Sequence, residues 1–239
     1  MICTPVVRRR GPSGMRPGAT ARIVLNICLE QLRIHHVLCL GAHCDDLEIG
    51  CGGTVLKLAE GRNPPAFTWV VFCSDARREA EALRSAETFL RQASRSRIII
   101  KKFRDGFLPY DGGQVKEAFE ELKGQVSPDL ILTHYREDLH QDHRLISELT
   151  WNTFRDHLIL EYEVPKYDGD LGTPNVFVPL DESLCRRRIE VILTSFPSQT
   201  GKRWFSEELF RSLLRLRGME CNAISDYAEA FYCRKAIVG

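Results

Sequence analysis

The chain has 239 residues, enough for one domain with a substantial core, and its 44% hydrophobic and 27% charged residues are close to globular averages. This composition excludes a chain that is disordered throughout. Its 33 basic and 32 acidic residues leave a formal net charge of +1, which argues against a protein of nucleic acids or anionic membrane surfaces, because such proteins carry a basic excess.

Residues 1–20 are rich in Pro, Gly and Arg and lack the charge-then-apolar order of a signal peptide. We therefore expect a disordered extension there, followed by a domain at 21–239. No apolar run of the sequence approaches the roughly 20 residues of a membrane-spanning helix, so no span is expected. The nine cysteines include no CxxC pair, which indicates reduced, buried thiols in a cytoplasmic protein rather than a disulfide scaffold.

Strand and helix patterns alternate along the first two thirds of the chain. Residues 21–32 could form a short helix or an edge element, whereas the apolar run 37–40 predicts a buried strand and 55–61 a helix ended by Gly61. The next predicted elements are strand 66–75, helix 76–93, strand 97–103, helix 114–126, strand 127–135 and helix 145–154. This alternation is typical of βαβ units, so we predict a single Rossmann-like α/β domain with a mostly parallel sheet flanked by helices.

The last third of the chain is mixed. A strand-like segment ends at Pro165, and residues 175–200 predict a short strand, a helix and a turn. Residues 204–219 predict a helix ended by Gly218. Residues 204–216 of this helix could pack on the core or form a homo-oligomer contact. The tail at 226–239 is too short for a separate domain.

Two polar clusters each follow a predicted strand. After strand 37–40 come, within six positions, His43, Asp45, Asp46 and Glu48. After strand 127–135 come, again within six positions, Asp138, His140, Asp142 and His143. Because the carboxyl ends of parallel strands lie at one edge of a sheet, the two clusters can converge there.

Converging histidines and aspartates predict a metal site. Catalytic zinc takes about three protein ligands and leaves a position for water. His43 and Asp46 could supply two of them, and the third would be either His140 or His143, between which the residues alone do not decide. Asp45 would remain beside the metal-bound water and could take its proton, which is the arrangement of metal-assisted hydrolysis.

Simpler interpretations exist for several of these residues. Asp45 could merely cap the following helix, and Asp142 is placed to orient an imidazole, a common role behind a metal ligand. The glycines of IGCGGT lack the Lys-Ser/Thr pair of a P-loop, so close packing of helix on sheet is the better explanation for them.

The segment AHCDDLEIGCGGT, followed further on by THYREDLHQDHR, resembles the motifs of the PIG-L/LmbE-like N-acetylglucosamine deacetylase family, usually written (A)HPDD and HxDH. FPSQ and YAEAF near the end also resemble later segments of that family. The resemblance implies a Rossmann-like fold and a zinc-dependent hydrolase that removes the N-acetyl group from a small-molecule amino sugar or glycoconjugate. Cys44 stands where the family usually has proline, which puts the rigidity of the turn in question.

The resemblance also implies residue roles. Zinc would be held by His43, Asp46 and His143. Asp45 would be the general base, and His140 would steady the oxyanion and protonate the amine, with Asp142 behind it. The residues expected near the substrate are Arg78, Asp105, Ser198 and Gln199.

Three alternatives remain at this point. The same site would serve an amidase that acts on a larger acyl or thiol-conjugate amide. Two histidines and one carboxylate also hold Fe²⁺ in non-haem iron oxygenases, although those sites usually lie in double-stranded β-helices. A sugar-binding protein without turnover is the third, against which the presence of both Asp45 and His140 argues.

Overall fold

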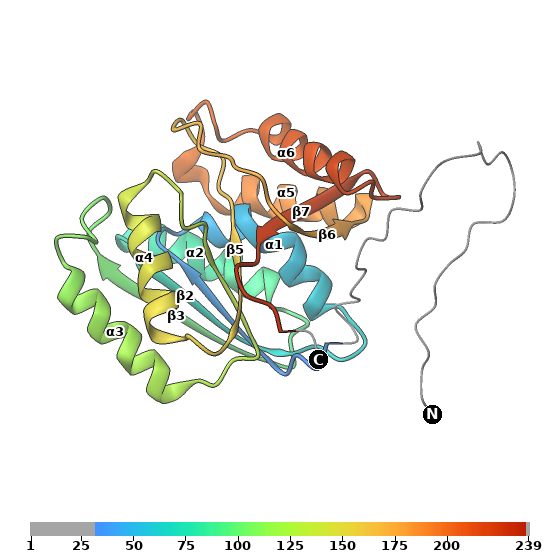
Figure 1. Cartoon of the computed structure of the whole chain (residues 1–239). Coiled ribbons are helices and arrows are strands. Elements are labelled where there is room, and N and C mark those ends of the chain that lie inside the picture. Colours follow the sequence, from blue (N-terminus) through green and yellow to red (C-terminus); the bar gives the residue numbers. More distant parts are fainter. Residues whose placement is uncertain (1–31, 238–239) are drawn as a thin grey trace, which may run out of the picture.

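Seven strands form one sheet in the computed structural model of the chain, which describes residues 32–237. Helices cover both faces of the sheet (Figure 1). The predicted α/β fold with a mostly parallel sheet is confirmed. The extension expected at 1–20 lies outside the described residues, as does the undecided segment 21–32 apart from its last residue.

Most predicted elements are present, with different bounds. In chain order they are β1 (His36–Gly41), α1 (Asp46–Ala59), β2 (Ala66–Cys73), α2 (Ala76–Phe89), β3 (Arg95–Phe103), α3 (Gly112–Gln125), β4 (Leu130–His134), α4 (Gln141–Thr153), β5 (Leu158–Tyr162), β6 (Val176–Leu180), α5 (Glu182–Ser195), the 3₁₀ turn η2 (Pro197–Gln199), α6 (Glu207–Glu220) and β7 (Tyr227–Tyr232). Helix α1 begins well before the predicted 55–61 and includes the glycines, and α6 continues through Gly218 rather than ending there.

The strand order is β3-β2-β1-β4-β5-β7-β6. Strands β1 to β5 run parallel, whereas β7 is antiparallel to both β5 and β6. The chain runs outward from β1 to β2 and β3, then returns to place β4 on the other side of β1. β1 and β4 are therefore neighbours at a topological switch point, where open α/β sheets bind their ligands. The two polar clusters follow these two strands.

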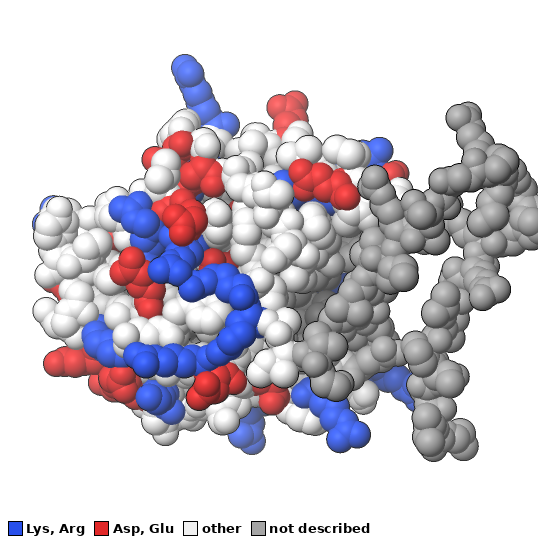
Figure 2. All heavy atoms as spheres, in the orientation of Figure 1, with Lys and Arg blue, Asp and Glu red and all other residues white. Residues whose placement is uncertain are grey.

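Each face of the sheet has its own apolar core. Helices α1, α2, α5 and α6 contribute to one core, and α3 and α4 pack on the opposite face (Figure 1). None of the helices within residues 32–237 is long and apolar enough to cross a membrane. On the face shown in Figure 2, basic and acidic side chains lie beside one another. The seven cysteines of the described part of the chain are free thiols.

Glycines let α1 pack closely against its neighbours. A Cβ atom at Gly50 would lie 2.1 Å from the ring of Tyr162 on β5, and one at Gly53 would lie 2.4 Å from Leu180 on β6. Any side chain at either position would collide with the sheet. The glycines therefore serve close helix packing, as expected for IGCGGT, and no phosphate cradle is needed to explain them.

The ion pair of Arg188 and Glu229, from α5 and β7, forms hydrogen bonds with backbone groups in the middle of α1. The carboxylate of Glu229, on β7, accepts from the backbone N–H groups of Gly53 (2.7 Å) and Thr54 (2.6 Å). Arg188, on α5, donates to the carbonyl oxygens of Glu48 and Ile49 and lies 2.9 Å from Glu229. A regular helix joins the Ile49 carbonyl directly to the Gly53 N–H. Here both groups have partners on other elements, so α1 depends on α5 and β7.

We expect Glu229→Gln to lower the free energy of unfolding by about 3 kcal/mol, because it leaves the guanidinium of Arg188 buried without its counter-charge. Urea denaturation would measure this loss. Glu182→Gln, which removes the partly exposed ion pair with Arg211, should cost less than about 1 kcal/mol. A loss below about 1 kcal/mol in Glu229→Gln would show that the two carbonyl oxygens alone are sufficient for Arg188.

Candidate metal centre

Two turns at the carboxyl edge of the sheet bring the clusters together. The first turn leads from β1 into α1 and carries His43, Asp45 and Asp46; the carboxylate of Asp46 accepts from the backbone N–H of His43 at 2.6 Å. The second turn leads from β4 into α4, where His140 is the N-cap residue and His143 lies in the first turn. Because β1 pairs directly with β4, the predicted convergence of the clusters is present.

Three donor atoms form a nearly equilateral triangle. His43 Nδ1 lies 3.1 Å from His143 Nε2 and 3.2 Å from Asp46 Oδ2, and the third side, His143 Nε2 to Asp46 Oδ2, is 3.4 Å. A tetrahedral zinc ion with bonds of about 2.0–2.1 Å keeps its ligand atoms about 3.3–3.4 Å apart. Two imidazoles and one carboxylate are also the donors that zinc and Fe²⁺ take in catalytic sites. The triangle therefore fits a divalent metal in size and chemistry.

His134, at the end of β4, is a member of the cluster that the sequence analysis did not single out. Its Nε2 atom lies 3.2 Å from Asp46 Oδ2 and accepts from the Ala42 N–H at 2.9 Å. Its buried ring stacks on His143 with a centroid distance of 3.9 Å. Burial lowers the pKa of His134 to about 4, so the ring is neutral. The sequence did contain a signal for His134: it is a histidine at the last position of the strand that leads into the second polar cluster.

Asp138 orients His143. Its Oδ2 atom lies 2.9 Å from His143 Nδ1, and its Oδ1 atom accepts from the His140 N–H at 2.8 Å. A carboxylate on one ring nitrogen fixes the tautomer that leaves the other nitrogen free for a metal. His143 Nε2 is consequently the atom that faces the triangle.

The position of Asp142 differs from the expectation that it lies behind His140. Its carboxylate accepts from the Gly106 N–H (2.7 Å) and the Leu108 N–H (3.1 Å) and lies 3.2 Å from His43 Nε2. Its hydrogen bond with His140 comes from the backbone N–H, which donates to the Nδ1 atom at 3.2 Å, and the carboxylate lies within 4.8 Å of a His140 ring nitrogen without bonding to it. The reason is that His140 is the N-cap of α4, so its ring turns toward a free N–H of the helix.

The capping bond also defines the proton position on His140. Because Nδ1 accepts, a neutral ring carries its hydrogen on Nε2. One ring nitrogen of His140 lies within 4.8 Å of ring nitrogens of His43 and His143. Burial lowers the pKa of His140, and the neighbouring His143 and His43 lower it further. His140 is thus a neutral imidazole beside the triangle with an N–H group to donate.

Asp45 has one oxygen held and one free. Its Oδ1 atom accepts from Arg78 Nη2 at 2.6 Å, and its buried Oδ2 atom has no partner among the described residues. Burial raises the pKa of Asp45, while Arg78 opposes this shift. Asp45 precedes α1, but its side chain makes no capping hydrogen bond, so the alternative of a simple cap is not supported. Arg78, expected at the substrate, contacts Asp45 instead.

The other residues expected at the substrate also have protein partners. Asp105 lies with its Oδ1 atom 3.2 Å from His43 Nε2, and its side chain is 71% exposed. Ser198 donates to Glu81 on α2 at 2.5 Å, and Gln199 donates to Ser198 at 2.8 Å. Within residues 32–237, no hydrogen bond joins Ser198 or Gln199 to the metal-binding triangle. They lie against α2, about one helical turn beyond Arg78.

Cys44 faces away from this cluster. Its thiol donates to the carbonyl oxygen of Cys73 at 3.4 Å, and burial raises the pKa of Cys44 to about 12. The side chain is therefore an uncharged thiol that anchors the turn to β2. This contact supplies some of the rigidity that proline would give.

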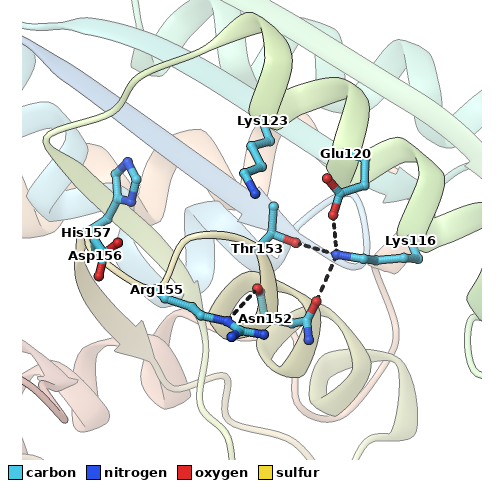
Figure 3. Close-up of a pocket in the computed structure, with 8 residues that line it drawn as sticks. All are labelled: Lys116, Glu120, Lys123, Asn152, Thr153, Arg155, Asp156 and His157. Carbon is cyan, nitrogen blue, oxygen red and sulfur yellow. Dashed lines mark hydrogen bonds and ion pairs between the residues drawn. The ribbon is translucent and has the colours of Figure 1, made fainter.

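A polar hollow of about 490 Å³ lies elsewhere, between α3 and the end of α4 (Figure 3). Its lining includes Lys116, whose ammonium group donates to Asn152 (2.8 Å) and Thr153 (3.1 Å) and pairs with Glu120 (2.5 Å). None of the predicted site residues lines it. Lys116 already has three oxygen partners within the hollow.

Residues 38–154 match the sequence profile of PIG-L, described as GlcNAc-PI de-N-acetylase. This segment of the chain is similar to the PIG-L family. The resemblance seen in the two motifs is thereby confirmed, and the matched range contains both polar clusters. No curated protein sequence matches the chain.

Solved structures share the fold of the chain at low identity. The N,N'-diacetylchitobiose deacetylase of Pyrococcus horikoshii has a TM-score of 0.65 at 21% identity, over 84% of each chain. The A40926 pseudoaglycone deacetylase has a TM-score of 0.61 at 17% identity, over 85% of this chain and 99% of its own. The 4-carboxy-2-hydroxymuconate hydratase of Pseudomonas putida KT2440 has a TM-score of 0.66 at 15% identity, over 85% and 98%. One fold thus carries more than one chemistry.

We expect divalent metal binding to weaken as the pH falls through the neutral range. Burial alone would lower the pKa values of His43 and His143. Neighbouring carboxylates, chiefly that of Asp46, outweigh burial: the pKa of His43 is well above its ordinary value, and the pKa of His143 is above its ordinary value. A metal must displace these protons, so its affinity should fall about tenfold per pH unit for each proton released. Calorimetry with Zn²⁺ in buffers of different ionisation enthalpy would count the released protons. A zinc affinity that does not change between pH 6 and pH 8 would contradict the prediction.

Proposed function

We propose that the protein is a zinc-dependent hydrolase that removes the N-acetyl group from an N-acetylated amino sugar or glycoconjugate, releasing acetate and a free amine. The observation that carries the proposal is the triangle of His43, Asp46 and His143, beside which Asp45 keeps one carboxylate oxygen free. The PIG-L match supports the same class of reaction, since that family is described as a de-N-acetylase.

Zinc held by these three residues would polarise the amide carbonyl and lower the pKa of a water molecule, which are the general contributions of zinc in hydrolases. Asp45 Oδ2 takes a proton from the attacking water, while Arg78 holds the other oxygen in place. His140 donates its Nε2 hydrogen as a hydrogen bond to the carbonyl oxygen on which negative charge develops. A neutral His140 would become an imidazolate if it gave up that hydrogen, so the proton that Asp45 has taken from water passes to the departing nitrogen, in place of the proton donation that the family resemblance implies for His140. The C–N bond breaks, and the two products are acetate and the amine.

Metal content and acetate release together test the proposal. Purified protein would be analysed for metals and incubated with a panel of N-acetylamino sugars, including disaccharides and glycoconjugates. One zinc per chain with acetate release would support the proposal. Iron with turnover of 2-oxoglutarate would favour the oxygenase, although the parallel sheet is not the usual fold for that chemistry. Sugar binding without acetate would favour a binding protein, and release of a larger acid would favour the amidase.

Asp45→Asn should keep zinc and lower kcat about 100- to 10,000-fold, the usual range for loss of a general base. The amide keeps the shape of the side chain but cannot accept a proton at neutral pH. Metal analysis and acetate release measured on the same preparation would separate the two effects. His143→Ala is the matched comparison, because it should lose zinc itself; retained turnover in Asp45→Asn would refute the proposed base.

Arg78→Met distinguishes a partner of Asp45 from a substrate contact. Burial raises the pKa of Asp45 and Arg78 lowers it, so removal of Arg78 raises that pKa further and moves the acidic limb of kcat/KM to higher pH. Arg77→Met, at a side chain that is 69% exposed, should leave the profile unchanged. A rise in KM with an unmoved acidic limb would instead support the substrate contact that the family resemblance implies.

A further inference from the structure

Lys166 lies in the segment between β5 and β6 with its ammonium group enclosed by carboxylates. Nζ lies 2.8 Å from Asp138 Oδ2 and 2.5 Å from Asp170 Oδ2, and it also donates to the Val164 carbonyl at 3.4 Å. The side chain of Lys166 is 13% exposed, and those of Asp138 and Asp170 are 2% and 5% exposed. Removal of one partner from an ion pair this deeply buried leaves an uncompensated buried charge.

Both carboxylates also hold the chain that leads into α4. Asp138 accepts from the N–H of His140, and Asp170 accepts from the N–H of Leu139 at 2.7 Å. Asp138 Oδ2, the atom that contacts Lys166, is the same atom that contacts His143 Nδ1. A single ammonium group therefore lies one carboxylate away from the predicted ligand His143 and beside the backbone of His140.

Contacts with α6 and β7 hold the segment that carries Lys166, on both sides of that residue in the sequence. Arg217, on α6, donates to the Gly172 carbonyl at 3.2 Å and pairs with Glu163 at 2.7 Å. The Gly172 N–H donates to the hydroxyl of Tyr232 on β7 at 3.0 Å. The ends of the segment are thus held by α6 and β7, so Lys166 reaches Asp138 from a well-anchored support.

Charge explains why the ammonium group matters. Without it, the buried carboxylates of Asp138 and Asp170 would face each other with no counter-charge between them and would repel each other. Repulsion would move the Asp138 carboxylate away from His143 Nδ1, and the ring would lose the contact that keeps Nε2 toward the triangle. Lys166 compensates the two charges and holds the Asp138 carboxylate against His143.

We propose that Lys166, together with Asp170, is a positioning residue for the metal centre: it acts through Asp138 to hold His143 as a ligand and His140 in place. The inference rests on the proposed function in one respect, that His143 binds zinc. It adds a residue from the β5–β6 segment, which lies outside both motifs.

Zinc affinity of the full chain, measured by competition with a chromogenic chelator, tests the inference. We expect Lys166→Met to weaken zinc binding about tenfold or more, the usual effect of losing a partner behind a metal ligand. Lys116→Met is a matched control, because Lys116 also has one carboxylate partner and two further oxygen partners. Lys116 is a residue of α3 and contacts the C-terminal end of α4, whereas Lys166 acts at the N-terminal end of α4 (Figure 3). Its zinc affinity should equal that of the unaltered chain.

A double-mutant cycle shows whether Lys166 acts through Asp138. In an Asp138→Asn background, Lys166→Met should cause little further loss of zinc affinity, whereas two independent losses that add would overturn the proposed route. Lys166→Arg should restore part of the affinity, because it restores the charge.

The outcomes separate this inference from the proposed function. Unchanged zinc affinity in Lys166→Met, with only a lowered Tm, would make Lys166 a stabilising residue and overturn the inference alone. A chain that binds no zinc before any substitution would overturn both. If Lys166→Met does not fold, Asp170→Asn serves instead: it should weaken zinc binding in the same direction by a smaller factor, and an unchanged affinity would refute the inference.

Discussion

The carboxylate of Asp46 is the group on which the arrangement of the site depends. Its Oδ2 atom is buried and lies within 3.4 Å of nitrogen atoms of His43, His134 and His143. Burial alone would raise the pKa of Asp46, but the imidazoles of His143 and His43 hold it well below its ordinary value. The negative charge collects histidines from both turns, and the same charge would attract a cation. The parallel pairing of β1 with β4 brings these groups close together, and Asp46 then keeps them there.

The two polar clusters could be predicted because they depend on rules that act locally: dense His and Asp at strand ends, and a parallel sheet that aligns those ends. The partners behind the ligands could not. Lys166 and Asp170 reach Asp138 from a segment whose path depends on α6 and β7. Lys166 and Asp138 are 28 residues apart in the sequence, so no local motif predicts their contact. β7 was missed for a similar reason, because a six-residue strand with a glutamate at its centre gains its stability from pairing on both sides.

Two loops that hold the ligands also present exposed apolar side chains. Gly106 donates to Asp142, and the neighbouring Phe107 and Tyr110 are 37% and 81% exposed. Lys166 contacts Asp138, and the next residue, Tyr167, is 73% exposed. Since the same loops contact Asp138 and Asp142, which in turn contact His143 and His43, a change of loop conformation that alters these exposed side chains would also reach the two histidines.

The bridge between Glu229 and α1 has a consequence for the order in which the protein folds. Glu229 is separated by 176 residues from Gly53, whose N–H it binds. Contacts between such distant parts of a chain form late, because a long loop must close first. The helix that begins with Asp46 therefore gains its full set of hydrogen bonds only after β7 has entered the sheet. A ribosome-bound chain that lacks β7 would hold both motifs, yet the helix that carries Asp46 would still lack the partner of its middle turn.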